Sequence, residues 1–535
     1  MEFNFNSYPY SSRREVVFSN KSMVATSNPS AALAGIEILR KGGNAIEAAL
    51  AAAISMPVVE PTCNGLGADL FAIISYKNKL YGINGSGRSP KKISIQALRK
   101  KSYEDMPFFG VDSVNTPGAV GAWFEIYNKF GKLPLKEIFE PAINYAKNGY
   151  ALSPKVAKLW DDEVNKYKNL KDICGLEEFF KVFSDKGKAP KAGDIVKNDN
   201  LKNTLEEILE TEGKSFYSGD LARKISSSVK DLGGFLDIDD LKAYKPLWVD
   251  PISTNYKGYD IWEMPPNGHG VSVLMALNIL NKLTLTDRED PKTLHKIIEA
   301  IKIAMTDGKT YIADPSFMKK RVDELLSDEY AEKRKKLIGT CAKNYKNILP
   351  ISPSTVYMAT ADSEGNMVSL IQSNYNGFGS GIVVPTTGIA LNNRLANFSF
   401  DSNSVNALSG GKLPYHTIIP GFISKDNKSI GPFGIMGGFM QPQAHVQVLT
   451  NMIDFNLNPQ AALDAPRFMW TGDKNVEIEM DYGNYMINTL KEFGHNMIIR
   501  SDYTDMGRGQ IILRLENGSY VGATEKRTDG YIGIY

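Results

Sequence analysis

The sequence predicts a layered α/β protein in which helices cover the faces of β-sheets. Three observations support this prediction. Residues 117–346 are mostly helical in pattern and charged, the chain becomes strand-like from Thr355 onwards, and two short apolar runs near residue 75 have the pattern of adjacent strands. With 535 residues the chain is longer than one core requires, so we expect one large domain or two intimately packed domains.

The segment from Met23 to Val59 is expected to form two helices. Ser27-Asn28-Pro29 offers a capping side chain and a proline for the first turn, and Gly42-Gly43 would end that helix. The alanine-rich run Ala45–Met56 would form the second helix, with close packing. Next, Leu70–Tyr76 and Leu80–Ile83 are expected to form paired strands around a three-residue turn.

The middle of the chain contains one especially clear amphipathic helix, Leu294–Tyr311, which we interpret as an ordinary packed helix. The prolines of Leu349–Pro353 favour an exposed connector. Beyond them, Thr355–Ala361 and Met367–Gln372 are strongly β-prone and flank a polar turn, so a hairpin is predicted. The glycine-rich loop Asn376–Gly381 follows; a tight turn is favoured there over a phosphate cradle.

The charge balance excludes several classes of partner. Lys plus Arg is 62, Asp plus Glu is 60, and the net charge of +2 gives no basic excess for nucleic acid or an anionic membrane. The most apolar early stretch, Ala45–Val59, contains Glu47 and Pro57 and is too short to span a bilayer. We therefore expect a small-molecule ligand, with no nucleic-acid and no membrane partner.

The cysteines and the first residues favour a cytoplasmic protein. The three cysteines, Cys63, Cys174 and Cys341, are widely separated and predict neither a disulfide framework nor a zinc site. Met1–Met23 has no continuous apolar run, which argues against a secretory signal. No phosphate loop, H-E-x-x-H helix or G-x-S-x-G elbow occurs, and the five histidines have no ligand spacing. No metal or organic cofactor is therefore expected.

The segment from Ser354 to Pro385 resembles the start of the small subunit in the γ-glutamyltransferase family, whose members cut themselves before a strand-initiating threonine. Thr355 occupies that position, and Asp362-Ser363-Glu364-Gly365-Asn366 matches the turn that follows. Met23–Gly67, Pro265–Gly268 and Asp464–Phe468 are also similar to family signatures, in the same order. The resemblance implies a four-layer αββα sandwich, with residues 1–354 as large subunit and 355–535 as small subunit of one folded unit.

The resemblance also implies catalytic roles. Cleavage between Ser354 and Thr355 would free an α-amine of ordinary pKa about 7.7–8.0, which can accept the proton of the Thr355 hydroxyl. Gly437 and Gly438 match paired glycines whose backbone N–H groups bind the oxyanion. Ser373 lies where the family has a second threonine that hydrogen-bonds the nucleophile.

The substrate subsite departs from the transpeptidase pattern. In the family an arginine binds the substrate carboxylate, and Ser86 stands at that position here. Arg88, two residues later, could bind a carboxylate or form a structural ion pair. Tyr375 stands at an asparagine position and Asn397 at an aspartate that would pair with an amino group. Pro414–Thr417 replaces paired serines, so that Tyr415, His416 and also Arg394 become candidate specificity residues.

These departures favour an acylase or small-amide amidohydrolase over a glutathione-processing enzyme. A true γ-glutamyltransferase or glutathione hydrolase with altered contacts is the alternative enzyme. A non-catalytic binding protein that never cleaves is an alternative of another class, suggested by Ser354 and by the altered subsite. The expected partners are a small amide and the two subunits of the same precursor, with a homo-oligomer left open.

Overall fold

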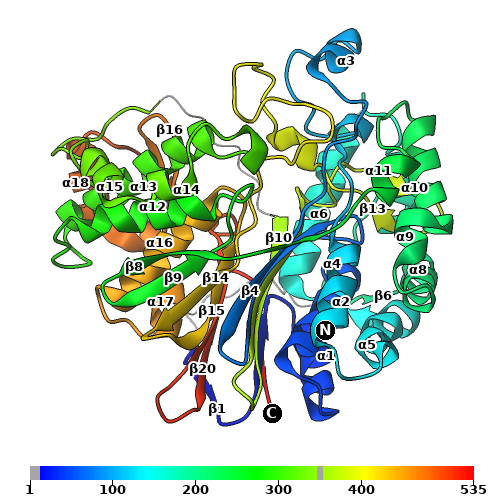
Figure 1. The fold of residues 1–535 in the computed structure, drawn as a ribbon, viewed down its shortest axis with the longest axis horizontal. Coiled ribbons are helices and arrows are strands. Elements are labelled where there is room, and N and C mark those ends of the chain that lie inside the picture. Colours follow the sequence, from blue (N-terminus) through cyan, green and yellow to red (C-terminus); the bar gives the residue numbers. More distant parts are fainter. Residues whose placement is uncertain (1–12, 171, 346–353) are drawn as a thin grey trace.

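The computed structural model describes residues 13–170, 172–345 and 354–535. Two seven-stranded sheets pack face to face, and each is covered on its outer face by helices, as Figure 1 shows. The four-layer αββα sandwich implied by the resemblance is therefore confirmed. Both halves of the chain contribute strands to each sheet, so the described residues form one interwoven unit.

The first sheet contains the proposed nucleophile strand as one of its inner strands. Its order is β21-β2-β10-β11-β3-β4-β7. The strands are β2 (Met23–Thr26), β3 (Asp69–Tyr76), β4 (Lys79–Gly85), β7 (Leu247–Val249), β10 (Ser354–Ala361), β11 (Met367–Tyr375) and β21 (Tyr531–Ile534). The predicted hairpin on either side of residues 362–366 is confirmed as β10 and β11, and the earlier strand pair as β3 and β4.

The second sheet faces the first across an apolar interface. Its order is β1-β20-β19-β15-β14-β9-β8. The strands are β1 (Val17–Ser19), β8 (Ile252–Tyr256), β9 (Tyr259–Glu263), β14 (Gly421–Lys425), β15 (Lys428–Met436), β19 (Arg508–Arg514) and β20 (Tyr520–Thr524). Phe71, Tyr357, Phe422 and Met436 meet between the sheets and exclude water from that interface.

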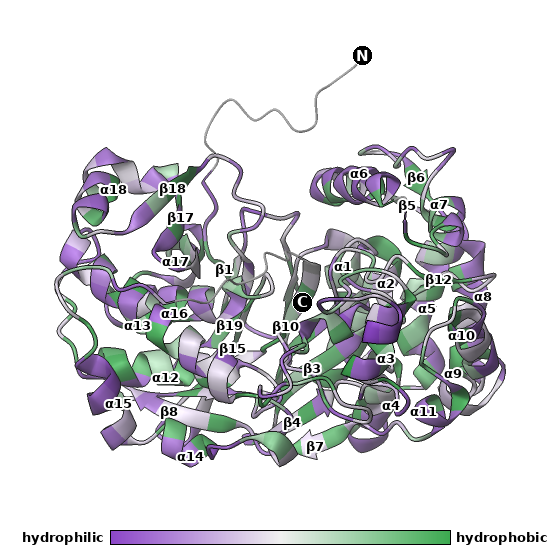
Figure 2. Ribbon diagram, turned by 90° about the horizontal axis from the view of Figure 1, so that it is seen from above, coloured by the Kyte–Doolittle hydropathy of each residue, from purple (hydrophilic) through white to green (hydrophobic). Residues whose placement is uncertain are grey.

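Helices from different parts of the chain form the outer layers. On the first sheet lie α1 (Pro29–Arg40), α2 (Ala45–Val59), α4 (Ala119–Phe130) and α5 (Leu135–Asn148); on the second lie α12 (Gly270–Asn281), α13 (Pro291–Tyr311) and α16 (Met440–Ile453). Every residue of α2 is buried, since other elements surround it, whereas the peripheral helices carry hydrophilic and hydrophobic positions side by side (Figure 2).

The remaining elements are short or peripheral. The other helices are α3 (Ile95–Lys100), α6 (Pro154–Asn169), α7 (Glu177–Phe183), α8 (Asp199–Glu210), α9 (Lys214–Ser218), α10 (Asp220–Asp231), α11 (Ile238–Lys242), α14 (Val322–Leu325), α15 (Asp328–Lys335), α17 (Pro459–Asp464) and α18 (Gly483–Glu492). The minor sheets contain β5 (Tyr150–Ala151), β6 (Ile195–Val196), β12 (Val383–Val384), β13 (Ile389–Ala390), β16 (Phe468–Gly472), β17 (Asn475–Glu479) and β18 (Asn496–Arg500).

Two expectations from the sequence need correction. Met23–Thr26 is a strand rather than part of a helix, because its β-branched and apolar residues complete the ladder between β10 and β21. The expected separation of helices and strands into two halves is also wrong: β8 and β9 lie in the helical half, and α16 lies in the strand-rich half. The connector at Leu349–Pro353 lies outside the described residues. Within the described ranges, no helix is long and apolar enough to cross a membrane.

Candidate active site

Thr355 lies at the start of the inner strand β10, where the pairing with β11 is irregular. Ser354 pairs with Tyr375 but Val356 pairs with Gln372, so one extra residue of β11 bulges opposite Thr355. The Thr355 hydroxyl donates a hydrogen bond to the Ser373 hydroxyl at 3.1 Å, and the Tyr375 N–H donates to the same oxygen at 2.8 Å. Both hydroxyl side chains are buried. The bulge thus aims the Ser373 oxygen at the hydroxyl of the predicted nucleophile.

Gly437 and Gly438 form the turn that joins β15 to α16. Their φ angles are +142° and +56°, which side-chain-bearing residues rarely adopt, and a Cβ on Gly437 would lie 3.3 Å from the Gly507 backbone. In the described residues, the backbone hydrogen bonds of this pair use the carbonyls, which accept from Met440 and Gln441. The N–H groups therefore stay available for an oxyanion at the start of α16.

The glycine turn and the start of β10 lie on facing sheets. Tyr357, on the same face of β10 as Thr355, packs directly against Gly434, three residues before Gly437. Ser369 of β11 also points across the interface toward the Phe433 carbonyl, at 3.4 Å. The first sheet therefore supplies the hydroxyl pair and the second supplies the glycine turn.

Asp69, which sequence reasoning did not single out, joins this site. It begins β3 directly opposite Ser373, and its carboxylate accepts from His416 Nε2 at 3.0 Å and from the Gly87 N–H at 3.2 Å. Burial raises the pKa of Asp69 to about 7, while Arg394 opposes that rise. The only signal in the sequence was an acidic residue at the edge of an otherwise apolar strand.

His416 is a neutral imidazole in a fixed tautomer. Its Nδ1 accepts from the Ile418 N–H at 3.3 Å, so Nε2 carries the proton that is donated to Asp69. Burial holds the pKa of His416 well below its ordinary value, and the Arg394 guanidinium adds to this effect. His416 therefore positions Asp69 and supplies no charge at neutral pH.

Arg394 is fully buried beside these groups. Its Nη1 donates to the Thr417 hydroxyl at 2.8 Å, its Nε lies 3.6 Å from Asp69, and its guanidinium carbon lies 4.7 Å from the centre of the Tyr375 ring. Burial lowers its pKa to about 10, so it stays charged at neutral pH. Among the described residues, Nε and Nη2 have no hydrogen-bond acceptor. Unsatisfied buried donors of this kind are costly, which makes them candidates to receive a ligand.

The other predicted subsite residues surround Arg394 at different distances. Tyr375 contacts it directly, with an unusual φ of +80° at the bulge. Asn397 ends the same 3-10 helix, Arg394–Asn397, and its side-chain nitrogen has no acceptor within the described chain. Tyr415 donates to His269 Nδ1 at 3.2 Å, because Nε2 of this neutral ring donates to the Thr417 carbonyl. Ser354 lies at the strand start, and its side chain is not described. The structure therefore brings most of the residues singled out from the sequence together around Arg394, and their roles stay predictions.

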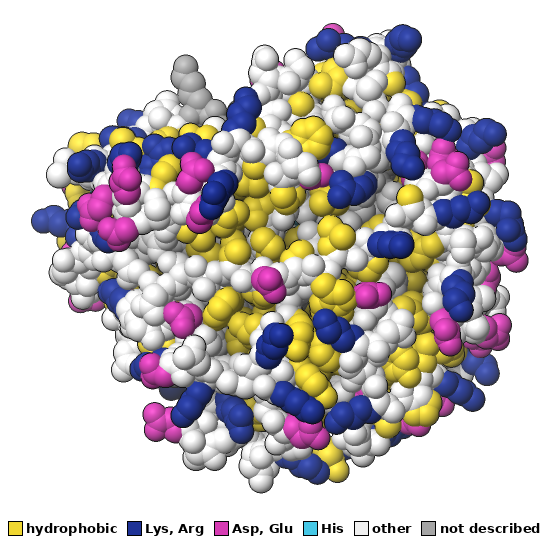
Figure 3. All heavy atoms as spheres, in the orientation of Figure 1, with side chains coloured by type: hydrophobic (Ala, Val, Ile, Leu, Met, Phe, Trp, Pro, Cys, Tyr) yellow, Lys and Arg dark blue, Asp and Glu magenta, His cyan; other side chains and the backbone are white. Residues whose placement is uncertain are grey.

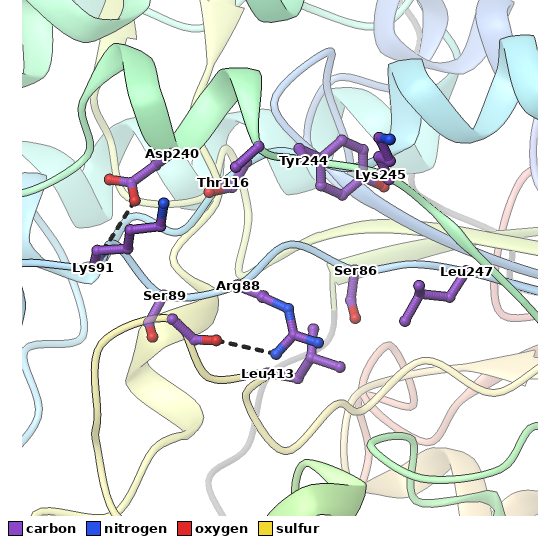
Figure 4. A pocket seen from close by; sticks show the side chains of 12 residues that line it. Ser86, Arg88, Ser89, Lys91, Thr116, Asp240, Tyr244, Lys245, Leu247 and Leu413 are labelled. Carbon is purple, nitrogen blue, oxygen red and sulfur yellow. Dashed lines mark hydrogen bonds between the residues drawn. The ribbon is translucent and has the colours of Figure 1, made fainter.

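Arg88 lies apart from the buried cluster. It forms an ion pair with Asp314 at 3.0 Å and donates to the Gly411 carbonyl, and its side chain is 51% exposed. It lines a cavity of about 200 Å³ together with Ser86 and Tyr244, as Figure 4 shows. Of the two roles considered from the sequence, the structure places Arg88 in the ion pair, since Asp314 takes one end of its guanidinium.

A second cluster of titratable groups lies away from this site. His295 and Glu299 of α13 meet His495, with ligand-type atoms close enough to hold a metal ion, although the sequence showed no ligand spacing. Lys302, however, donates to Glu299 at 2.8 Å and to His495 Nδ1 at 3.3 Å. His495 Nε2 then donates to His295 Nδ1 at 2.8 Å, and His295 Nε2 to the Gly339 carbonyl at 3.0 Å. The ammonium and this directed chain already satisfy the three side chains.

The charged side chains are dispersed over the molecular surface. On the face that Figure 3 shows, basic and acidic side chains are scattered over both halves. Apolar side chains gather between the two halves of that face. The observed distribution matches the near-zero net charge of the chain.

Comparison with known proteins agrees with this geometry. The family model for gamma-glutamyltranspeptidase matches residues 31–535. The glutathione hydrolase-like YwrD proenzyme of Bacillus subtilis is 34% identical over 96% of this chain and 98% of its own. The oxamate amidohydrolase proenzyme of Klebsiella pneumoniae is 30% identical over 94% of this chain and 97% of its own.

A solved structure extends the similarity to three dimensions. The cephalosporin acylase from Bacillus halodurans superposes with a TM-score of 0.97 at 48% identity, covering 100% of this chain and 99% of that one. The fold is therefore the N-terminal-nucleophile hydrolase sandwich, and the relatives that share it are enzymes. On the extent of the family match and the full-length similarity of these relatives, the chain belongs to the gamma-glutamyltranspeptidase family of enzymes.

Proposed function

We propose that this protein is a self-processing amide hydrolase that acts through an acyl-Thr355 intermediate. The observation that carries the proposal is the Thr355–Ser373 hydroxyl pair, 3.1 Å apart at the start of β10, on the sheet that faces the one leading into the Gly437-Gly438 turn. The family match and the proenzyme relatives support cleavage before Thr355, which would divide the chain into residues 1–354 and 355–535.

The chemistry would follow from the new amino terminus. The freed α-amine of Thr355 has an ordinary pKa of about 7.7–8.0, so a fraction is neutral near pH 7 and can accept the hydroxyl proton. The hydroxyl oxygen then attacks the substrate carbonyl, and the N–H groups of Gly437 and Gly438 stabilise the oxyanion. Proton transfer from the ammonium to the leaving nitrogen releases the amine and leaves an ester on Thr355. Attack by water, with the same amine as base, releases the acid.

Substrate choice would differ from that of a glutamyl-specific enzyme. A γ-glutamyl group carries an ammonium, and the resemblance places Asn397 where an aspartate would receive it. The buried Arg394 guanidinium beside Asn397 disfavours a second cation and favours an acceptor or an anion. We therefore propose an acylase or small-amide amidohydrolase, as the names of two relatives also suggest.

The first experiment concerns processing. Purified wild-type protein should give two fragments on denaturing electrophoresis, one of which begins T-V-Y-M by N-terminal sequencing, whereas Thr355→Ala should remain at 59.1 kDa. Persistence of the wild type as one inactive band would contradict the proposal and favour the uncleaved binding protein.

The second experiment separates the two enzyme classes. A chromogenic γ-glutamyl anilide should be turned over at least tenfold more slowly than the best amide of a panel containing oxamate and β-lactam side-chain amides. Rapid turnover of the γ-glutamyl compound, accelerated by glycylglycine, would instead identify a true γ-glutamyltransferase.

A further inference from the structure

A lysine outside the predicted subsite lies close to the glycine turn. Lys309 comes from the C-terminal end of α13, and its Nζ is 4.7 Å from the centre of the Phe439 ring and 5.3 Å from that of Tyr415. Phe439 directly follows Gly438, and Tyr415 directly precedes His416. Each of the two rings that the ammonium contacts is therefore adjacent in sequence to a residue of the candidate active site.

The two rings form a platform for this cation. Tyr415 and Phe439 are stacked with centres 5.9 Å apart and an angle of 16° between planes, and His269 meets both rings edge-on. A cation over aromatic faces is attracted by the ring electrons, and more strongly when it is desolvated. The platform fixes where the ammonium lies but does not neutralise its charge.

Among the residues that the structure describes, no carboxylate compensates Lys309. Within the part of the chain that the structure describes, its ammonium forms neither an ion pair nor a hydrogen bond, although the side chain is partly buried. Burial lowers its pKa to about 8, which leaves it mainly protonated at pH 7. A partly desolvated cation without a counterion is costly, and an anionic ligand would remove that cost.

The nearby groups leave the site with an excess of positive charge. His269 and His416 are neutral, because burial lowers the pKa of each, and Arg394 remains charged at neutral pH. Asp69 is the carboxylate that contacts Arg394 and His416, and its pKa is raised to about 7 by burial. Lys309 and Arg394 both lie near His269, and the carboxylate beside Arg394 carries at most one negative charge.

We propose that Lys309 forms an anion subsite beside the Gly437-Gly438 turn and thereby raises the preference of the enzyme for amides that carry a carboxylate. This inference rests on the proposed amide hydrolysis and assigns a further specificity-determining residue to the same site. The carboxylate belongs either to the acyl part or to the leaving amine; both have the same chemistry at Lys309. The alternative is a purely structural role, in which the aliphatic part of the Lys309 side chain covers the two aromatic rings.

Two matched pairs of substrates test the proposal and locate the carboxylate. On the acyl side, glutaryl 4-nitroanilide is compared with valeryl 4-nitroanilide, which has a methyl group in place of the carboxylate. On the amine side, the acetyl amide of 4-aminobenzoate is compared with acetanilide. The readout is the ratio of kcat/KM within each pair, because a general loss of activity cancels in that ratio.

We expect the wild type to prefer the charged member of one pair by at least tenfold. Lys309→Met should reduce that preference at least tenfold, and Lys309→Arg should restore most of it. Lys292→Met, an exposed lysine on the same helix, serves as the control and should leave both ratios unchanged. An unchanged ratio in Lys309→Met, with turnover intact, would overturn the subsite.

A binding experiment keeps this test separate from the proposed reaction. Glutarate is titrated into Thr355→Ala and into the same protein carrying Lys309→Met, with calorimetry as readout. Tenfold weaker binding in the double variant supports the subsite, even when no amide is turned over. Equal binding, or none to either protein, contradicts it. Absence of Thr355-dependent turnover in the wild type would count against the proposed function instead.

Discussion

The Thr355 hydroxyl donates to the Ser373 hydroxyl across a β-bulge, and the backbone N–H of Tyr375 donates to the same Ser373 oxygen. Ser373 thus orients the predicted nucleophile from a position that is itself fixed by the backbone. Asp69 flanks Ser373 on the next strand, so that three neighbouring strands contribute to the same site.

Removing the Ser373 hydroxyl should slow both self-cleavage and amide turnover. Ser373→Ala leaves the Thr355 hydroxyl without its orienting partner, and we expect kcat to fall about 10- to 100-fold, a change of roughly 1.4–2.7 kcal/mol in the barrier. Ser373→Thr keeps the hydroxyl and should retain most activity. The rate of fragment formation and kcat are measured together with thermal unfolding. A Ser373→Ala protein with normal rates would refute the orienting role.

Substitution in the glycine turn should reduce kcat more than stability. Gly437→Ala introduces a Cβ close to the Gly507 backbone and disturbs the N–H groups aimed at the oxyanion. Loss of one such donor elsewhere costs about 10²–10³ in kcat, so a fall of at least tenfold is expected. Gly258→Ala is the control, since it also has positive φ (+88°) but lies in an open turn. Equal activity in both variants would argue against an oxyanion role.

Arg394 should control selectivity between acyl groups. Arg394→Gln removes a buried cation whose Nε and Nη2 have no acceptor among the described residues, and we expect KM for the preferred amide to rise at least tenfold, about 1.4 kcal/mol. Arg88→Gln breaks a partly exposed ion pair with Asp314 and should change KM less than threefold. A larger rise of KM in Arg88→Gln than in Arg394→Gln would indicate that Arg88 binds the substrate carboxylate.

The buried Asp69 should make stability fall as pH rises. Its pKa is about 7 in the folded protein and about 3.9 in the unfolded chain. Between these values the folded state holds a proton that the unfolded state has lost. The contribution of protonated Asp69 to the free energy of unfolding is therefore complete below about pH 4 and is lost as pH rises through about 7.

Asp69→Asn should remove this dependence. From pH 4 to 7, the free energy of unfolding of the variant should increase relative to that of the wild type, with a steepest slope of about 1.4 kcal/mol per pH unit. Urea unfolding at a series of pH values measures it, and Asp250→Asn at an exposed position is the control. Parallel pH curves for Asp69→Asn and wild type would contradict the raised pKa.

The pair His295 and His495 should make stability fall as pH falls, which is opposite to the effect of Asp69. Burial lowers the pKa of both His295 and His495, the latter to about 2, against about 6.5 when unfolded. Their stabilisation is present above about pH 6.5 and is lost as pH falls, because the unfolded state binds protons first.

His495→Gln should therefore be destabilised most at neutral pH. The variant breaks the hydrogen-bond chain to His295, at a cost of about 1–3 kcal/mol, and removes a group that resists protonation. The difference in Tm from wild type should shrink between pH 7.5 and pH 5. A gap that stays constant over this range would show that the pair does not titrate on unfolding.

Local patterns allowed much of the fold to be predicted. The β10–β11 hairpin, the strand pair β3–β4 and helix α13 were all predicted from periodicity, because each is decided by neighbours within a few residues. Met23–Thr26 was mistaken for helix, since its strand state depends on β10, more than 330 residues away. The intermixing of helices and strands likewise reflects long-range pairing, which no local window contains.

The sequence by itself determined the layered class, the hairpin that begins at Thr355, and the residue types at the candidate subsite. Only the tertiary structure decided that Asp69 flanks Ser373, that Arg88 pairs with Asp314, and that Lys309 lies over the rings beside the glycine turn. The physical reason is that charge compensation and burial depend on which side chains meet in space. Residues far apart in the chain make those contacts, and the sheet pairing brings them together.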